Sequence, residues 1–561
     1  MTARLHTELE AIWFGAADAP LAGFLHHPPG ATRGAAIICP PFGYEEVCSH
    51  RTLRYLATRL AEQGILTLRF DYEGQASSGG ESGSPAALSQ WRSSVTAAIQ
   101  EVRGLGMPSP AVIGVRLGAA LACEALAHDA HLGPLVLWAP TTSGRRAARE
   151  FHALSLITPG SRSPGESLNV LGHPVAEQTL AQLRQWRPLE GMPAGHPVLL
   201  VESRGWRDTE STRADLTAAG IHPHVVNVPG TAEVLERDAE LVRVPTPLIA
   251  RIVTWVSSHV GSARMDVAIA SRSSERSIDT PKGTVREELV AIPPRRLHGV
   301  LSGPEDEKCD SVVLFLNNGV APARGPGRAW SEYARSLASS GVASLRLDLS
   351  GLGDSPDSAG PPVLVGQPVS PRAGVDTQNA IKWLRKRGYR RVVVVGLCSG
   401  GLISLLAASS GKLDAEVLVA INAPLFAPRN VGDGPPVWRL WQALTWGTHR
   451  RRVRARLHRL PAWVWRLLDL TWVFPSPARL LTMASRHVPD VTVIYGGAAE
   501  ELVDIQVRAG AVVTRLAADG VVDLRVLPGM DHSLFDPTFR QRVLEIIRGK
   551  CAVDPAVAVV P

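Results

Sequence analysis

The chain has 561 residues, of which 45% are hydrophobic, so it holds material for two to four domains at about 150 residues each and is not a mainly disordered protein. Its net charge is +7, from 59 Lys and Arg against 52 Asp and Glu. Only six of the basic residues are Lys, and a preference for Arg along the whole chain indicates coding composition rather than a phosphate-binding stripe, so we expect no nucleic-acid partner.

The six cysteines form no CxxC pair, which predicts neither a disulfide framework nor a zinc site. No phosphate-binding glycine loop or cluster of metal ligands stands out, so no cofactor and no metal are expected. The first residues lack a long apolar run, and the most apolar later stretch, 462–474, contains Arg466 and Asp469. Without a signal peptide or a spanning helix, the chain is expected to be cytoplasmic.

Four sequence blocks occur twice in the same order. The pairs are 35–43 with 312–320, 60–74 with 337–351, 111–122 with 393–404, and 225–236 with 523–536. The offset between the copies grows by about 17 residues before the fourth block, so the second copy carries an insertion there. The repeat predicts two domains, 1–258 and 285–552, joined by a Ser- and Arg-rich linker at 259–284 and followed by a tail at 553–561.

Each copy alternates short apolar runs with amphipathic helical patterns. In chain order, the first copy has expected strands at 37–40, 66–71, 111–115, 133–139, 197–202 and 224–228 and a helix at 51–64; the second has expected strands at 312–317, 343–348, 392–396, 416–422, 491–496 and 523–528 and a helix at 329–341. Continuous apolar strands separated by helices predict an α/β fold for each domain, with a mostly parallel sheet covered by helices on both faces. Function in such sheets lies at the carboxyl ends of the strands.

The segment 391–409 runs from an apolar strand through Gly396-Leu397-Cys398-Ser399-Gly400 into an apolar helix. This strand-turn-helix, the nucleophile elbow, needs small residues two positions before and two after the nucleophile, because the tight turn brings other backbone against them. Gly396 and Gly400 bracket Cys398 in this way, whereas Ser399 as the nucleophile would put Leu397 where a small residue is needed. We therefore favour Cys398 over Ser399; the alternative is that Cys398 is a buried structural thiol.

A base and an acid are expected downstream, because the chain order in this arrangement is nucleophile, acid, histidine. His532 follows the last expected strand and can take the thiol proton and later protonate a leaving group. Its orienting acid belongs after the preceding strand, where Glu500, Glu501 and Asp504 qualify; we choose Glu500, with Asp504 next. The alternative for these carboxylates is an ordinary acidic start of a helix.

Negative charge that develops on a substrate oxygen needs donors, for which the backbone N–H groups of Ser399 and Asn318 are our candidates. Asn318 lies in the loop after the early strand of the second copy, and Arg324 and Arg328 follow in that loop. The two arginines are candidates for binding an anionic substrate group, although solvated surface arginines are the favoured interpretation.

These segments resemble the α/β-hydrolase superfamily, in particular its serine-aminopeptidase-like and esterase-like members, over both copies. The motifs that carry the resemblance are the stretch from Asp348 to Ser355, the elbow, and the turn from Gly529 to His532. The resemblance implies a tandem duplication of an α/β-hydrolase domain. Cysteine in the nucleophile position is similar to dienelactone hydrolases, in which a thiolate attacks an activated ester.

The first copy lacks these catalytic groups. Arg116 stands where the second copy has Cys398, and Glu233 stands where it has His532, so hydrolysis is not expected in the first copy. Its Gly-x-Arg-Leu-Gly form resembles hydrolase-like proteins associated with exosortase and exopolysaccharide gene clusters. Arg116 is expected to pair with Glu233, the alternative being that it holds a carboxylate or phosphate ligand.

The extra length of the second copy falls at about 423–487, where the fold of these relatives mounts a cap over its site. It contains Trp438, Trp441, Trp446, Trp463, Trp465 and Trp472 together with the basic run 447–459. We expect a helical cap lined with aromatic side chains and suited to an apolar or acyl-bearing substrate. The alternatives are a peripheral membrane contact through residues 438–472 and a surface for another partner.

Together these residues predict a hydrolase of small-molecule esters, lactones or thioesters that is active in the second copy only. Acyl transfer to a hydroxyl or an amine uses the same residues and stays open, as does a wholly non-catalytic binding or scaffold protein.

Overall fold

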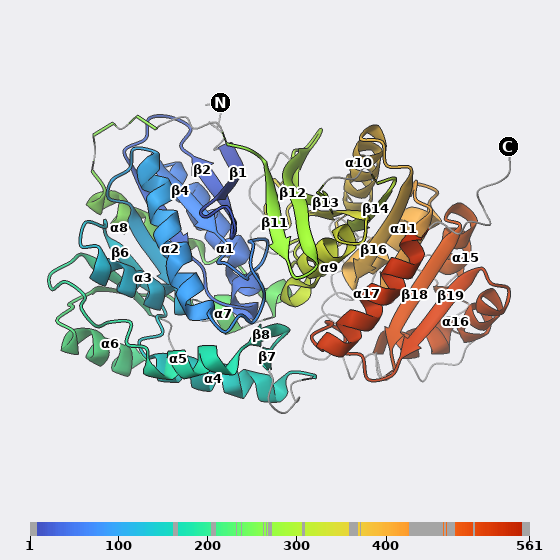
Figure 1. Ribbon diagram of the computed structural model, residues 1–561. Helices are drawn as coiled ribbons and strands as arrows, with labels where there is room; N and C mark the ends of the chain where they lie inside the picture. Colours follow the sequence, from blue (N-terminus) through green and yellow to red (C-terminus); the bar gives the residue numbers. More distant parts are fainter. Residues whose placement is uncertain are drawn as a thin grey trace. The chain divides into compact units, whose positions relative to one another are not determined.

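The structure is a computed structural model. It describes residues 8–160, 167–202, 209–229, 231, 233–236, 238–261, 263–264, 266–267, 272–305, 309–357, 369–370, 372–425, 464, 467, 477–497 and 500–552. The chain divides into two compact units, with the division between Leu289 and Val290. Figure 1 labels the helices and strands of both units.

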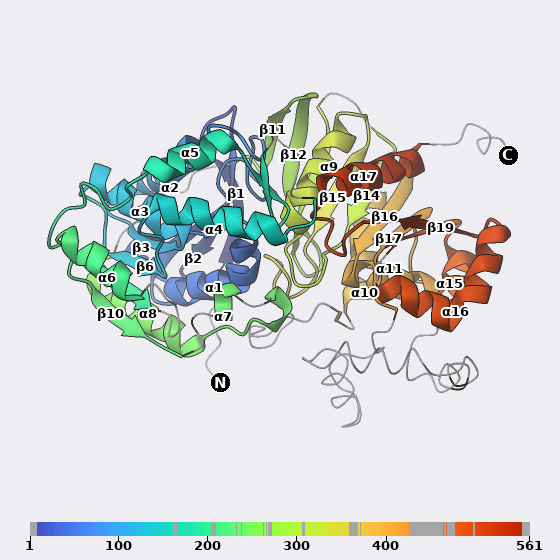
Figure 2. The same ribbon diagram turned by 90° about the horizontal axis from the view of Figure 1, so that it is seen from below.

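The first unit is built around an eight-stranded sheet with the order β1-β2-β4-β3-β5-β6-β9-β10 in the part of the chain that is described. Its elements are β1 (Glu8–Phe14), β2 (Leu21–His27), β3 (Gly34–Cys39), α1 (Tyr44–Ala61), β4 (Ile65–Phe70), α2 (Ala87–Gly104), β5 (Ala111–Val115), α3 (Leu117–His128), β6 (Leu135–Trp138), α4 (Gly144–Ile157), β7 (Leu168–Val170), β8 (His173–Val175), α5 (Glu177–Gln185), β9 (Val198–Glu202), α6 (Thr209–Ala218), β10 (His224–Asn227), α7 (Glu233–Glu236), η1 (Ala239–Leu241) and α8 (Thr246–His259). The pairs β1–β2 and β2–β4 are antiparallel, and the later pairs of this sheet are parallel. Helices α2 and α3 cover one face and α1 and α8 the other (Figures 1 and 2).

The second sheet has nine strands in the order β11-β12-β13-β15-β14-β16-β17-β18-β19 within the described residues. Its elements are β11 (Glu275–Thr280), β12 (Gly283–Ile292), β13 (Leu297–Pro304), β14 (Ser311–Phe315), η2 (Pro326–Arg328), α9 (Ala329–Ala338), β15 (Ala343–Leu347), α10 (Ala373–Lys386), β16 (Arg391–Leu397), α11 (Ser399–Ser409), β17 (Val417–Ile421), α15 (Pro477–His487), β18 (Asp490–Gly496), α16 (Glu500–Ala518), β19 (Val522–Leu527) and α17 (Pro537–Cys551). From β15 to β19 the neighbouring strands are parallel. Helices α9 and α17 cover one face, and α10, α11, α15 and α16 cover the other (Figures 1 and 2).

The two sheets repeat the same strand order, because β2-β4-β3-β5-β6-β9-β10 corresponds to β13-β15-β14-β16-β17-β18-β19. The likeness extends to single hydrogen bonds. Ser78 Oγ donates to the carbonyl of Asp71 (2.6 Å) and accepts from the N–H of Ala22 (3.0 Å). Ser355 Oγ in turn donates to the carbonyl of Asp348 (2.5 Å) and accepts from the N–H of His298 (2.8 Å). The predicted pair of mostly parallel α/β domains in tandem is therefore confirmed.

The parallel strands were predictable because both of their faces are buried. In β16, Val392, Val393, Val394 and Val395 are each 0% exposed, so four consecutive positions are apolar and the run stands out in the sequence. The antiparallel strands at the start of each sheet were missed, as was β11, which lies inside the range predicted as a linker. In β11 only Ile278 is buried, which leaves almost no apolar pattern.

The range predicted as a cap begins after β17. The six Trp and the basic run lie outside the described residues, as does the membrane contact proposed for residues 438–472 and the tail at 553–561. The end of the predicted range, however, forms α15, which packs on α11 and α16 and so belongs to the cover of the sheet. The sequence did not separate α15 from the predicted cap, because a cap helix and a helix that covers a sheet have the same amphipathic pattern.

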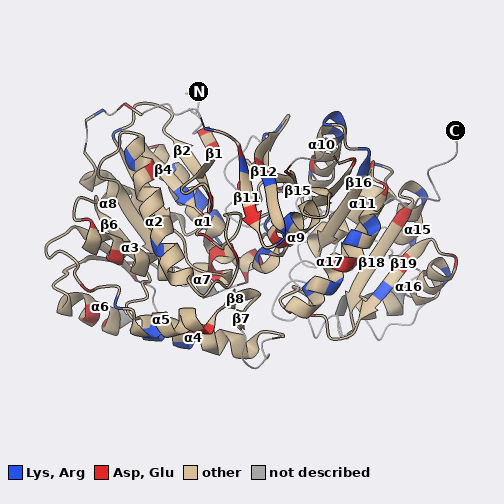
Figure 3. Ribbon diagram, in the orientation of Figure 1, with Lys and Arg blue, Asp and Glu red and all other residues tan. Residues whose placement is uncertain are grey.

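Basic and acidic side chains are interspersed in both units (Figure 3). Lys550 on α17, for example, lies 2.9 Å from Asp490 and 3.2 Å from Asp523, and Arg92 on α2 lies 2.8 Å from Glu124 on α3. Among the helices that the structure describes, none is long and apolar enough to cross a membrane.

Candidate active site

Cys398 occupies the sharp turn between β16 and α11. Its backbone has φ 55° and ψ −119°, a positive-φ conformation that costs a non-glycine residue about 1–3 kcal/mol and is characteristic of functional turns. A Cβ on Gly396 would lie less than 3.0 Å from the backbone of Gly400, and one on Gly400 less than 3.0 Å from the carbonyl of Asn317. Both glycines are thus required by the turn, in the positions that the elbow frame around Cys398 demands.

Cys398 and Ser399 differ in what their side chains do. Cys398 is partly exposed, whereas Ser399 is 2% exposed and its Oγ accepts the N–H of Gly319 at 2.8 Å. Ser399 therefore ties the loop after β14 to the start of α11. A hydroxyl that is buried in this bond is poorly placed to attack a substrate.

The loop after β14 is built by Asn317 and Asp348. Asn317 is buried; its Nδ2 donates to Asp348 Oδ1 (2.8 Å) and to the carbonyl of Ala321 (2.9 Å), and its Oδ1 accepts the N–H of Leu349 (2.8 Å). Asp348 also accepts the N–H groups of Ala323 (2.7 Å) and Asp354 (2.9 Å). The motif from Asp348 to Ser355 thus organises the loop. The motif is recognisable in the sequence, whereas nothing in the sequence singles out Asn317.

Asn318 is next in this loop and is partly buried. Its Oδ1 is shielded from solvent and has no hydrogen-bond partner among the residues that the structure describes. Arg324 and Arg328 are buried, with 7% and 3% exposure, so the interpretation of both as solvated surface arginines is wrong. The loop folds back through η2 onto α9, where the carbonyl of Arg324 accepts the N–H of Trp330 (3.0 Å), and this turn takes both side chains out of water.

His532 lies on the loop between β19 and α17, and its side chain is exposed. The loop is held from within by Asp531, whose carboxylate accepts the N–H groups of Ser533, Phe535 and Asp536 at 3.0–3.1 Å. Across the strands, Nδ2 of Asn422 donates to the carbonyls of Asp531 (3.2 Å) and His532 (3.0 Å). The histidine segment is therefore fixed at the carboxyl edge of the sheet, beside the end of β17.

A buried arginine also joins the histidine loop to the loop after β14. Arg540 on α17 donates through Nε to the carbonyl of Leu534 (2.5 Å) and through its two terminal nitrogens to the carbonyls of Gly327 and Pro326 (3.1 Å each). Its own carbonyl accepts the hydroxyl of Tyr333 on α9 (2.6 Å). Sequence reasoning missed Arg540, because a single Arg in an amphipathic helix carries no distinguishing signal.

The three candidate acids lie at the start of α16, which follows β18 directly. β18 pairs with β19, whose end leads to His532, so the backbone puts Glu500, Glu501 and Asp504 at the same edge of the sheet as the histidine loop. The side chains of all three lie outside the described part of the structure. The choice among them remains a prediction.

The first unit keeps the backbone of the elbow, with an arginine at the turn. Arg116 has φ 55° and ψ −117°, and Cβ atoms on Gly114 and Gly118 would again lie less than 3.0 Å from backbone atoms. Its guanidinium donates to Glu45 Oε1 on α1 (2.9 Å) and to Glu150 Oε2 on α4 (2.7 Å). Burial of the guanidinium disfavours its charge, but the two carboxylates outweigh this and raise the pKa of Arg116.

We expected Arg116 to pair with Glu233, but the two carboxylates that hold its guanidinium are those of Glu45 and Glu150. Glu233 is exposed at the start of α7, whereas Glu45 and Glu150 are 71 and 34 residues from Arg116 in the chain and come together only in the fold. With two carboxylates on its guanidinium, Arg116 is already neutralised at the place where an anionic ligand would have to bind.

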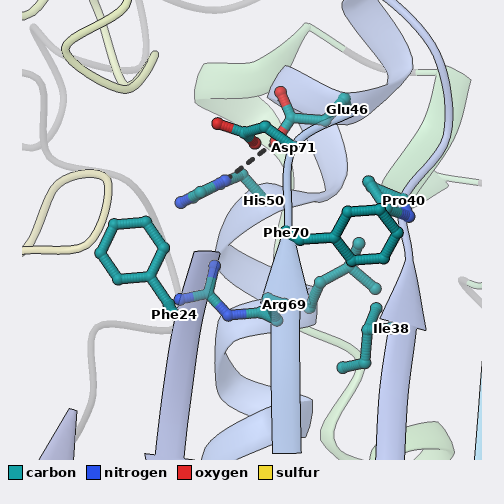
Figure 4. Close-up of a pocket in the computed structure, with 9 residues that line it drawn as sticks. Phe24, Ile38, Pro40, Glu46, His50, Arg69, Phe70 and Asp71 are labelled. Atoms are coloured by element: carbon teal, nitrogen blue, oxygen red, sulfur yellow. Dashed lines mark hydrogen bonds and ion pairs between the residues drawn. The ribbon is translucent and has the colours of Figure 1, made fainter. Parts of the chain in front are cut away.

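A small cavity in the first unit lies between α1 and the end of β4, where Glu46, His50, Arg69 and Asp71 converge (Figure 4). His50 Nδ1 is 3.0 Å from Glu46 Oε1, and Arg69 Nε donates to His26 Nε2 at 3.0 Å. The volume of about 20 Å³ is room for a single water molecule and not for a substrate.

Two family comparisons match separate parts of the chain. Residues 313–546 match the alpha/beta hydrolase family, and residues 32–182 match serine aminopeptidase, S33. No protein of curated function matches the chain.

Solved structures with a similar fold each span less than half of this chain. A hypothetical protein from Pseudomonas aeruginosa is 18% identical, covers 46% of this chain and 94% of its own, and has a TM-score of 0.35. Est1E from Butyrivibrio proteoclasticus with ferulic acid bound is 17% identical over 44% of this chain and 98% of its own, with a TM-score of 0.36. A soluble variant of monoglyceride lipase from Saccharomyces cerevisiae with a substrate analogue is 14% identical over 46% of this chain and 97% of its own, with a TM-score of 0.35.

Proposed function

Because both units of this chain belong to the α/β-hydrolase superfamily, we propose that the second unit cleaves esters, lactones or thioesters of small molecules with Cys398 as its nucleophile, and that the first unit is inactive. The observation that carries the proposal is the contrast within the elbow. Cys398 is partly exposed at the strained turn, whereas the hydroxyl of its neighbour Ser399 is buried and bonded to Gly319.

The proposed reaction begins at the Cys398 thiol. His532 takes its proton as the sulfur attacks the carbonyl carbon, and the electron pair of the C=O bond moves onto the oxygen. The backbone N–H groups of Ser399 and Asn318 stabilise that oxyanion. When the tetrahedral intermediate collapses, the bond to the leaving group breaks and His532 donates the proton to the departing oxygen or sulfur, which leaves an acyl thioester on Cys398.

Water completes the cycle. His532 removes a proton from a water molecule that attacks the thioester, and the returning proton regenerates the Cys398 thiol as the acid product leaves. Glu500, or Asp504, is proposed to orient His532 and to stabilise its protonated form. The loss of both catalytic groups from the first unit, where Arg116 and Glu233 stand instead, supports its assignment as inactive.

The test uses the purified full chain with p-nitrophenyl acetate, dihydrocoumarin and a short acyl thioester, and detects the acyl adduct by intact mass and peptide mapping. We expect an adduct on Cys398 and, in Cys398→Ala, a loss of turnover of about 10³-fold or more. Cys309→Ala is the matched control, since Cys309 is also partly exposed, and should keep wild-type turnover.

Three results would count against the proposal in different ways. An adduct on Ser399 would overturn the assignment of the nucleophile. Wild-type protein that neither forms an adduct nor turns over any of these substrates would favour a non-catalytic binding protein. An adduct that is discharged faster by an added alcohol or amine than by water would assign acyl transfer instead of hydrolysis.

A further inference from the structure

A buried asparagine links three parts of the carboxyl edge in the second unit. Asn422 follows β17 directly and is 0% exposed. Its Nδ2 donates to the carbonyls of Asp531 (3.2 Å) and His532 (3.0 Å), and its Oδ1 accepts the N–H of Gly496 at the end of β18 (3.0 Å). Both ends of the amide are therefore used, and each of its partners is a backbone group at the edge where the proposed chemistry takes place.

The backbone of Asn422 is also held in an uncommon conformation. Its φ is 44°, in the left-handed region that few residues other than glycine and asparagine adopt readily, and its N–H donates to the carbonyl of Ile494 at 2.8 Å. Close packing surrounds this point, because a Cβ on Gly496 would lie less than 3.0 Å from the carbonyl of Met530, two residues before His532. The ends of β17 and β18 thus meet the histidine loop without space for rearrangement.

The first unit supplies an internal comparison. Ala139 follows β6 just as Asn422 follows β17, with φ 45° and with its N–H on the carbonyl of Val201 at the end of the next strand (3.0 Å). The backbone arrangement is thus the same in the two units, but alanine has no amide to hold a loop. The first unit, which has Glu233 in place of His532, therefore also has Ala139 in place of Asn422.

From this geometry we infer that Asn422 is a positioning residue that holds His532 in place for the chemistry at Cys398. The inference rests on the proposed function of His532 as the base. Asn422 touches neither substrate nor sulfur; it acts through the backbone of the loop that carries the imidazole. Two hydrogen bonds from the amide to adjacent carbonyls fix both the position and the orientation of that backbone segment.

The variant that tests this inference is Asn422→Ala, which reproduces the residue found at position 139. Since Ala139 holds the same φ in the first unit, the backbone is compatible with alanine, and the fold is expected to survive. We expect kcat to fall about 10–100-fold with KM nearly unchanged, because the base is displaced while the rest of the site is not. Asn422→Asp keeps the size and the acceptor for Gly496 but loses the N–H donors, so it should lose as much activity as Asn422→Ala.

A double-variant comparison separates positioning from a general structural role. If Asn422 acts through His532, adding Asn422→Ala to His532→Ala should cause no further loss of turnover. A further loss equal to that in the wild-type background would overturn the inference, as would a kcat of Asn422→Ala within about 2-fold of wild type.

Hydrogen exchange of the amides at 529–536 measures how well the histidine loop is held in place, and it does not depend on substrate turnover. We expect faster exchange there in Asn422→Ala and unchanged exchange at 396–402, the elbow. Unchanged exchange at 529–536 would overturn the inference. If wild type turns over no substrate but Asn422→Ala still shows the faster exchange, the proposed function is overturned. The conclusion that Asn422 holds the histidine loop in place would then still stand.

Discussion

The elbows of the two units have the same backbone conformation and different side chains at the turn. Arg116 and Cys398 differ by no more than 2° in φ and ψ, and glycines two positions away on each side are required in both. In one unit the side chain at the turn is a guanidinium held by Glu45 and Glu150; in the other it is a partly exposed thiol. The strained turn is therefore a property of the fold, and reactivity depends on what the fold places there.

The cysteines also differ in burial, and the two partly exposed ones are both in the second unit. Cys39, Cys48 and Cys123 of the first unit are buried, and desolvation by burial raises the pKa of each thiol to about 12. Cys551 of the second unit is buried in the same way, also with a pKa of about 12, whereas Cys309 and Cys398 are partly exposed.

The largest effect that we expect is in thiol reactivity. At pH 8 a thiol of pKa 12 is thiolate to only about one part in 10⁴, so iodoacetamide should modify Cys309 and Cys398 in the native protein and leave Cys39, Cys48, Cys123 and Cys551 at least about 10²-fold slower. Peptide mapping after timed alkylation measures this. Rapid native labelling of any first-unit cysteine would break the contrast between the units.

A smaller effect is expected when the turn itself is disturbed. Gly396→Ala and Gly114→Ala should each destabilise their own unit by about 1–3 kcal/mol, because the added methyl group meets backbone that cannot move aside. Hydrogen exchange read separately over the two units at increasing urea concentration measures the shifts. Gly510→Ala and Gly104→Ala are matched controls, since a Cβ at either position meets nothing within 4 Å, and should leave stability equal or higher.

These two variants sharpen the comparison of the elbows. Equal losses in the two units would show that the glycines serve the turn regardless of catalysis. A loss in the second unit alone would mean that the turn of the first elbow tolerates a methyl group that the turn of the second does not.

The smallest expected effect is that of a grafted nucleophile. Arg116→Cys placed in a Cys398→Ala background should give no turnover, because the first unit has Ala139 and an exposed Glu233 where the second has Asn422 and His532. Ester hydrolysis by the full chain measures this against Cys398→Ala alone. Recovery of a tenth or more of wild-type turnover would show that a thiol at the turn suffices.

The features that could be predicted from the sequence are those encoded in a few neighbouring residues. The strands β3 to β6 and β14 to β17 were predicted because both faces of these parallel strands are buried and most of their positions are apolar, and the glycines of the elbow were predicted because their spacing is fixed by a five-residue turn. β11 could not be found, since most of its side chains are exposed and polar.

The partners of the site residues were beyond the sequence for a different reason. Asn422 contacts a loop more than 100 residues further along the chain, and Glu150 contacts Arg116 from helix α4, 34 residues away. Nothing in the neighbourhood of either residue indicates such a contact. The repeat carries one signal for Asn422: it aligns with Ala139 after equivalent strands, so the two copies differ there as they do at the proposed nucleophile.

The guanidinium of Arg540 binds three carbonyls, two of them more than 200 residues earlier in the chain than itself. It thereby links the loop that bears the proposed base to the loop that bears a proposed oxyanion donor. Because these bonds couple the two loops, we expect the distance between the proposed base and the proposed donor to vary less than the position of either loop.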